Sequence, residues 1–354
     1  MEMLCRGVLG GGLGEARSIL NHQVPLDFND PNPRLYLERV ASSLGLPRPV
    51  VGLMTAADVS RACHRGAWAG GAAIDVVVTA GASNATSIRE EAPFRVGTVN
   101  VVVVVDANLA PPCMVELVSV AGKAVAEAFR ELDVRGPRGG PACGTTTDSF
   151  IVACTRRGVE VPYGGMATEL GRAVALCVVE AVKEALVRSE GLSPDRPLIR
   201  RLEERGVTFN DLIEAAMEVL IPEVGGLDEV REALATCLEE ALNDVNVASL
   251  VMAGLRLEED GARGLIPGLK AGELREGPVR LLADEVIGME VARYIAGTKG
   301  AFEFIRLDRA KPGVLKRLGP FAEDVIGGLI AGASSNAYSR LLAGRRGLEG
   351  SKRA

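Results

Sequence analysis

The residues best suited to chemistry lie in the last third of the chain, where acids are followed one helical turn later by glycine. The pair Asp284-Glu285 precedes Gly288, and Asp324 precedes the pair Gly327-Gly328. Residues three or four positions apart lie on one face of a helix, so each predicted helix presents an acid beside a position without a side chain. Glycine costs about 1 kcal/mol in a helix interior. We therefore expect a neighbouring helix, or a metal with a phosphate, to approach closely there.

Carboxylates that converge from separate helices suit Mg²⁺, because this ion takes oxygen ligands and keeps positions for a substrate phosphate. Asp308 and Lys311, which we expect on a loop that ends at Pro312, would add a ligand and a catalytic cation for the phosphate. The predicted metal ligands are therefore Asp284, Glu285, Asp308 and Asp324. The alternative is a set of solvated helix charges, with helices that pack through small residues.

The first half of the chain carries three polar clusters at predicted strand ends: residues 83–86, Asn100 and residues 143–148. Hydroxyls and amides can donate to a developing oxyanion, and a carboxylate or imidazole can act as a base. The catalytic candidates here are His22, Asn84, Thr147, Asp148 and Glu169. The alternatives are a turn whose threonines bond to their own backbone and a histidine held for structure. A nucleophilic role for Cys143 also stays open.

Hydrophobic patterning predicts the elements that position these residues. Short β-branched runs are typical of buried strands, and we expect strands over 50–55, 74–79, 98–105 and 149–154. We expect helices over 34–44, 115–132 and 168–188. Residues 1–34 are rich in Gly, Pro, Asn and Asp, and we expect turns over 27–33 and no strand of length before Gly10. The first half therefore reads as an α+β domain, with a buried mixed sheet covered by helices.

The second half reads as an all-α bundle. We expect helices over 211–220, 228–241, 245–255, 279–295 and 321–342. A stretch with glycine, two prolines and charges separates the halves. The predicted organisation is a domain at 1–190, a linker at 191–197, a domain at 198–345 and a disordered tail at 346–354.

Composition excludes several classes of protein. The 354 residues carry a net charge of −6, which argues against a general nucleic-acid binder. The seven cysteines are scattered and only two histidines are present, so a structural zinc site is not expected and a reduced cytoplasm fits best. The sequence predicts neither a secretory signal nor a membrane span. We expect a cytoplasmic protein, and a homo-oligomer stays open.

The C-terminal motifs carry a family resemblance. Residues from about 200 to 343 resemble the phosphatidylglycerophosphatase A superfamily, through Asp284-Glu285 before Gly288 and through residues 294–300, 307–313 and 322–331. The resemblance implies an all-helical, Mg²⁺-dependent phosphatase. The family usually has paired aspartates where this chain has Glu323-Asp324, and we assign the ligand role to Asp324.

The N-terminal half resembles the adenosylcobinamide amidohydrolases. The matching stretches are residues 19–24, 51–56, 78–85, 97–101 and 144–149. That family cleaves the amide between aminopropanol and the corrin side chain and releases adenosylcobyric acid. The resemblance carries no assignment of catalytic residues, so the roles above rest on side-chain chemistry alone. Whether this half uses a cofactor stays open.

The fusion resembles the bifunctional hydrolases of cobamide (vitamin B12) salvage, which join this amidohydrolase to an α-ribazole-5′-phosphate phosphatase. It implies a corrinoid substrate for the first half and α-ribazole phosphate for the second, with Mg²⁺ in the second. Two alternatives remain, a lipid phosphatase in the second half and a corrinoid-binding module without turnover in the first.

Overall fold

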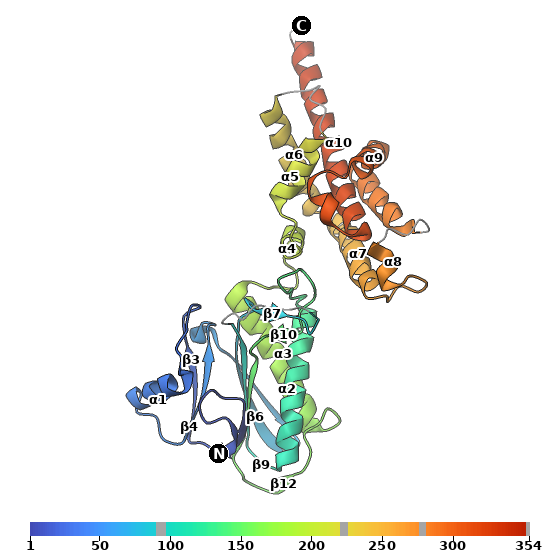
Figure 1. Cartoon of the computed structure of the whole chain (residues 1–354). Coiled ribbons are helices and arrows are strands. Elements are labelled where there is room, and N and C mark those ends of the chain that lie inside the picture. The colour runs from blue at the N-terminus through green and yellow to red at the C-terminus, as the bar shows by residue number, and fades with distance from the viewer. Residues whose placement is uncertain (90–96, 220–225, 276–280, 352–354) are drawn as a thin grey trace. The chain divides into compact units, whose positions relative to one another are not determined.

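The computed structural model describes residues 1–89, 97–219, 226–275 and 281–351 (Figure 1). It divides the chain into two compact units, Met1–Asp195 and Arg196–Ala354. Helix α3 (Glu169–Glu190) ends the first unit, with Gly191 in a left-handed conformation after it. Helix α4 (Leu198–Glu203) opens the second unit.

A six-stranded mixed sheet forms the centre of the first unit. Its order is β2 (Gly12–Glu15), β1 (Glu2–Cys5), β11 (Ser149–Cys154), β8 (Val99–Val105), β6 (Ala72–Ala80) and β5 (Cys63–Ala69). Strands β8 and β11 are parallel and the other pairs are antiparallel. The predicted mixed sheet with helical cover is confirmed. Two small two-stranded sheets flank it, β7 (Ala85–Thr86) with β10 (Gly144–Thr145), and β9 (Asn108–Leu109) with β12 (Glu160–Val161).

The valine run of β8 is buried on both faces, which explains why it does not alternate with polar residues. Val101 and Val103 face α3 and helix α2 (Pro111–Glu131), which cover one side of the sheet (Figure 1). Val102 faces the other way, onto a second layer. Asn100 shares the alternation of Val102 and therefore points into that same layer.

The second layer is a parallel pair, β3 (Ser18–Gln23) and β4 (Val50–Thr55), joined through helix α1 (Pro33–Ser43). Leu53 packs toward the six-stranded sheet, while Leu20 and Val50 pack with Leu37 of α1 on the far side. A 3-10 turn, Val59–Arg61, follows β4.

Strands β1, β2 and β3 lie within residues 1–34, where the sequence had predicted no strand. These strands are short, and every residue of β2 is exposed, so no apolar pattern marks them. Strand β5 was missed because glycine and charged residues interrupt it.

The second unit is helical in every element that the structure describes. After α4 come α5 (Phe209–Glu218), α6 (Leu227–Leu242), α7 (Val245–Ala262), α8 (Ala271–Arg275), α9 (Ala283–Ala310), a 3-10 turn (Gly313–Arg317) and α10 (Pro320–Ser351). The apolar face of α10, with Val325, Leu329 and Ile330, lies at the core. Residues 220 and 279–280, which end or begin two predicted helices, lie outside the described residues.

Helix α9 consists of two segments, because Ala296 and Gly297 leave helical geometry and Gly297 has φ 62° and ψ −147°. A β-carbon at Gly300 would lie 2.1 Å from the Ala292 carbonyl oxygen, so the second segment packs back onto the first. Asp308 therefore lies in the last turn of a helix, and the predicted loop was wrong. Helix α10 extends to Ser351, into the stretch where a tail at 346–354 was predicted, and 352–354 lie outside the described residues. No helix in the described ranges has the length and apolarity that a membrane crossing requires.

Candidate functional site

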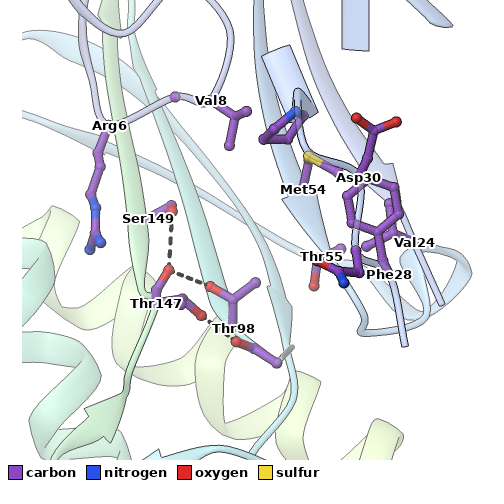
Figure 2. Close-up of a pocket in the computed structure, with 14 residues that line it drawn as sticks. Arg6, Val8, Val24, Phe28, Asp30, Met54, Thr55, Thr98, Thr147 and Ser149 are labelled. Atoms are coloured by element: carbon purple, nitrogen blue, oxygen red, sulfur yellow. Dashed lines mark hydrogen bonds between the residues drawn. The ribbon is translucent and has the colours of Figure 1, made fainter. Parts of the chain in front are cut away.

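A cavity of about 450 Å³ opens where β8 and β11 begin, and Figure 2 shows its walls. Arg6, Thr98, Thr147 and Ser149 lie on one side, and Phe28, Asp30, Met54 and Thr55 lie on the other. We call this space the first cavity. Its walls combine hydroxyls, one guanidinium, one carboxylate and apolar side chains, which is the composition of a small-molecule site.

A buried amide network holds Met54, which lines the first cavity. Asn100, 1% exposed, donates to Asn21 Oδ1 over 2.8 Å and to the Met54 carbonyl oxygen over 3.1 Å. Asn21 donates in turn to Thr79 Oγ1 over 3.0 Å. The network joins β8 and β6 of one layer to β3 and β4 of the other, so it sets the spacing between the two walls.

The residue 143–148 loop is held by a second set of hydrogen bonds. Buried Asn84 donates to the Gly97 carbonyl oxygen over 2.6 Å and to Thr147 Oγ1 over 3.2 Å. The Thr147 hydroxyl also donates to the Gly97 carbonyl oxygen, and Thr98 donates to the Thr147 carbonyl oxygen over 2.7 Å. Asn84, Thr147 and the start of β8 therefore form one rigid edge.

The Asp148 carboxylate is turned into this loop. It accepts hydrogen bonds from the Thr145 amide at 3.1 and 3.2 Å and from the Val99 amide at 3.3 Å. Burial raises the pKa of Asp148 above its ordinary 3.8, although these donors and nearby Arg6 lower it. Arg6 donates to the Asp148 carbonyl oxygen over 2.6 Å.

A second cavity of about 350 Å³ adjoins the first, and Gly97 lines both. Its walls include Ala57, Gly81, Ser83 and Glu190. The Ala82 amide donates to Glu190 Oε1. Glu190 ends α3, and its sequence position looks like an ordinary solvated helix end.

In the second unit, three acids converge. Oxygens of Asp308, at the end of α9, and of Glu323 and Asp324, in the first turn of α10, all lie within 4.8 Å of one another. Lys311 Nζ donates to Glu323 at 2.5 and 2.6 Å and to Asp308 at 3.1 Å. Burial, followed by the charges of Glu323, Asp284 and Asp308, raises the pKa of Asp324 to about 8.

Close helix contact positions these acids. A β-carbon at Gly288 would lie 2.4 Å from the Asp324 carbonyl oxygen, and one at Gly328 would lie 2.1 Å from the Gly288 carbonyl oxygen. Of the two explanations for these glycines, the neighbouring helix is the one observed. The contact brings Asp284, which is 8% exposed, close enough to affect Asp324, whereas Glu285 is exposed.

The donor set fits a hard divalent cation. All three clustered groups offer carboxylate oxygens, as Mg²⁺ prefers. A cation would also offset the mutual repulsion that disfavours ionised Asp324. Glu323, which we had not counted as a ligand, belongs to the cluster, and Glu285 does not.

Comparison with known proteins identifies the first unit. The family model described as adenosylcobinamide amidohydrolase matches residues 1–194. The chain belongs to the adenosylcobinamide amidohydrolase family. That membership places it among the hydrolases. The match ends at residue 194, next to the boundary between the two units.

Relatives agree with this membership. An adenosylcobinamide amidohydrolase of Methanosarcina mazei is 29% identical over 195 residues, which are 50% of this chain and 86% of that protein. One of Halobacterium salinarum is 32% identical over 200 residues, 52% of this chain and 80% of that protein. An uncharacterized protein of Methanocaldococcus jannaschii is 34% identical over 130 residues, 36% of this chain and 99% of its own length.

Within the first unit, the structure brings only some predicted residues together. Thr147 lines the first cavity, and Asn84 and Asp148 hold the loop that carries it. His22 lies on the α1 side of β3, where its Nε2 is 3.1 Å from the Tyr36 hydroxyl. Glu169 is exposed at the start of α3 and accepts from the Gly70 amide over 3.3 Å. Ser189, near the other end of α3, bonds to Ala80, so Glu169 is one helix length from the cavities.

Sequence reasoning missed Arg6, Asp30 and Glu190 as lining residues. Arg6 and Asp30 follow strands β1 and β3, which the apolar pattern did not reveal. Recognition of β1 would have marked Arg6 as a candidate, because it directly follows the strand and loops at strand ends often carry sites.

Proposed function

We propose that the first unit hydrolyses the amide between aminopropanol and the corrin side chain of adenosylcobinamide, releasing adenosylcobyric acid. The observation that carries this proposal is the family match over residues 1–194, which spans every residue that lines the first cavity. Drug-sized ligands take cavities of about 300–1,000 Å³. A cavity of about 450 Å³ suits the amide-bearing side chain, with the macrocycle at the mouth.

The chemistry requires a base for water and donors for the oxyanion. Asp30 is the carboxylate among the described residues that line the first cavity. Its Oδ1 accepts from the Asn32 amide over 2.7 Å, which orients the carboxylate and leaves Oδ2 for a water proton. Arg6 supplies a cation on the opposite wall, where negative charge would develop on the carbonyl oxygen.

In this proposal three of the other predicted residues support the site and two lie away from it. Thr147 and Asn84 hold the edge of the cavity against which the substrate's amide lies. Asp148 fixes the loop because its carboxylate accepts hydrogen bonds from the backbone N–H groups of Thr145 and Val99. His22 and Glu169 take no part in the reaction, because His22 lies on the far face of β3 and Glu169 at the far end of α3.

This activity is tested with the full chain and adenosylcobinamide, followed by liquid chromatography and mass spectrometry. The proposal predicts adenosylcobyric acid and aminopropanol in equal amounts. Tight binding of the corrinoid without any product would support the binding-module alternative instead.

For the second unit we propose a Mg²⁺-dependent phosphomonoesterase, with α-ribazole-5′-phosphate as substrate. The acidic cluster of Asp308, Glu323 and Asp324 supports it, with buried Asp284 alongside. Mg²⁺ would supply positive charge to the phosphate oxygens at this cluster. Lys311 holds Glu323 and Asp308 in place and is the cation nearest to an incoming phosphate among the groups bonded to these acids.

The test compares phosphate release from α-ribazole-5′-phosphate and from phosphatidylglycerophosphate, with Mg²⁺ and with chelator. We expect release from the ribazole phosphate only when Mg²⁺ is present, and its loss in Asp324→Asn. Release from the lipid alone would support a lipid phosphatase. Full activity in chelator would rule out a metal role for the cluster.

A further inference from the structure

The first and second cavities are neighbouring compartments with shared walls. Gly97 lines both. The end of β4 lines both cavities, with Met54 and Thr55 in the first and the next two residues in the second. The segment after β3 also lines both, with Val24 in the first cavity and Leu26 in the second. A ligand that reaches past Gly97 would therefore occupy both.

The second cavity presents one carboxylate without a cationic partner among the described residues. Asp58 and Arg61 also line it, but they neutralise each other across 3.4 Å, and Asp58 accepts from Ser60 as well. Glu190 accepts only the Ala82 amide among its described contacts. A β-carbon at Gly81 would lie 3.4 Å from Glu190 Oε1, so the absence of a side chain there keeps the carboxylate accessible.

The first cavity presents the opposite charge. One guanidinium nitrogen of Arg6 donates a hydrogen bond to the Asp148 carbonyl oxygen. A guanidinium carries five N–H donors, so others remain for a ligand. Arg6 is exposed and lies beside Thr147 and Ser149 in Figure 2, apart from Asp30 on the facing wall.

We propose that the two cavities divide the scissile amide, with the acyl half beside Arg6 in the first and the amine half beside Glu190 in the second. This inference rests on the proposed amide hydrolysis. In that reaction the C–N bond breaks and a bond forms between the carbonyl carbon and the water oxygen. Both water protons end on nitrogen at neutral pH, which gives a carboxylate and an ammonium.

The charges decide the orientation. Each product acquires its charge only on cleavage, and in this orientation each charge meets its opposite. The reversed orientation would place the ammonium beside Arg6 and the carboxylate beside Glu190, with repulsion in both cavities. It also follows that Asp30, the proposed base, lies on the acyl side, where water attacks.

The test uses 1-aminopropan-2-ol and its uncharged counterpart propane-1,2-diol as inhibitors of amide hydrolysis by the full chain. We expect the amine to inhibit at a concentration about tenfold or more below that of the diol, as a charged hydrogen bond predicts. In Glu190→Gln this preference should vanish. The control is Glu180→Gln, the same change at an exposed acid on the same helix, paired with Lys183; it should retain the preference.

For the acyl half, Arg6→Gln should weaken product inhibition by adenosylcobyric acid, and Arg6→Lys should restore part of it.

The outcomes separate this inference from the proposed function. If hydrolysis occurs but Glu190→Gln keeps the full preference for the amine, the division of the amide is wrong while the activity stands. If no hydrolysis occurs, titration calorimetry with the same two compounds replaces inhibition. Tighter binding of the amine than of the diol that is lost in Glu190→Gln would then support the amine site, while the proposed hydrolysis would be wrong. Equal affinity of the wild-type chain for the amine and the diol would overturn the inference in either case.

Discussion

Asn100 on β8 donates to Asn21 Oδ1 on β3 over 2.8 Å, and this bond ties the two layers of the first unit together. Removal of the Asn100 side chain leaves Asn21 Oδ1 and the Met54 carbonyl oxygen without that donor. We expect Asn100→Ala to lower the free energy of unfolding by about 1–3 kcal/mol.

A double-mutant cycle with Asn21→Ala isolates the contact. The two substitutions should be less than additive, with a coupling of about 0.5–3 kcal/mol, measured by chemical denaturation. Full additivity would mean that the bond between the layers contributes nothing to stability.

The sequence predicted the parts of this unit whose side chains are uniformly apolar. The valine run of β8 reads as a buried strand because both of its faces are covered. Strand β3, which carries Asn21, and strand β1, which precedes Arg6, could not be predicted, since their burial depends on partners far away in the chain, such as Ala153 opposite Met3.

Failure to recognise β3 also explains why His22 was chosen as a catalytic candidate. His22 follows Asn21 directly, and successive residues of a strand point to opposite faces. Had β3 been recognised, the alternation would have placed only one of the two beside Asn100. Glu190 was beyond reach for another reason. Glu190 lines the second cavity because Gly81 and Ala82 lie beside the end of α3. No local sequence pattern predicts that contact.

In the second unit, the glycine-after-acid pattern correctly located the helix faces that meet. It could not decide which acids cluster, because Asp308 reaches Asp324 only after the chain reverses at Gly297. The pattern of residues 296–300 contains no proline, so a reversal between two helical segments was not expected there.

The two carboxylates of the amidohydrolase site should behave differently when neutralised. Asp30→Asn removes the proposed base while its Oδ1 can still accept from the Asn32 amide. We expect at least the roughly 10²-fold loss of kcat typical of a lost base, with an unchanged melting temperature. Asp148→Asn should lower the melting temperature, because its carboxylate accepts from Thr145 and Val99. Steady-state kinetics and calorimetry on both variants distinguish the base from the structural carboxylate. If Asp148→Asn kept its melting temperature and lost more kcat than Asp30→Asn, the two roles would be reversed.

Asp148 also predicts a pH dependence. Burial raises its folded-state pKa above 3.8, so its protonated form favours folding. That contribution is complete below about pH 4 and is lost as the pH rises through the folded pKa. The melting temperature of Asp148→Asn relative to wild type should therefore improve from pH 3 to pH 7. Calorimetry across that range checks the sign, and a difference that worsens with pH would contradict it.

Two helical glycines of the second unit make a matched pair. Gly288→Ala would place a β-carbon 2.4 Å from the Asp324 carbonyl oxygen, and overpacking of this kind costs about 1–3 kcal/mol. Gly344 lies on exposed α10 surface with nothing within 4 Å, so Gly344→Ala should stabilise by up to about 1 kcal/mol. Denaturant titrations of both variants would show opposite shifts. Equal shifts would mean that the contact between α9 and α10 is looser than described.

The most direct test of the whole account is hydrolysis of adenosylcobinamide by the full chain in ¹⁸O-labelled water. We predict adenosylcobyric acid with one ¹⁸O in its new carboxylate, an equal amount of aminopropanol, and a rate that falls about 10²-fold or more in Asp30→Asn. Unchanged adenosylcobinamide after incubation with a folded, corrinoid-binding chain would contradict the central claim that the first unit is a hydrolase acting on this amide.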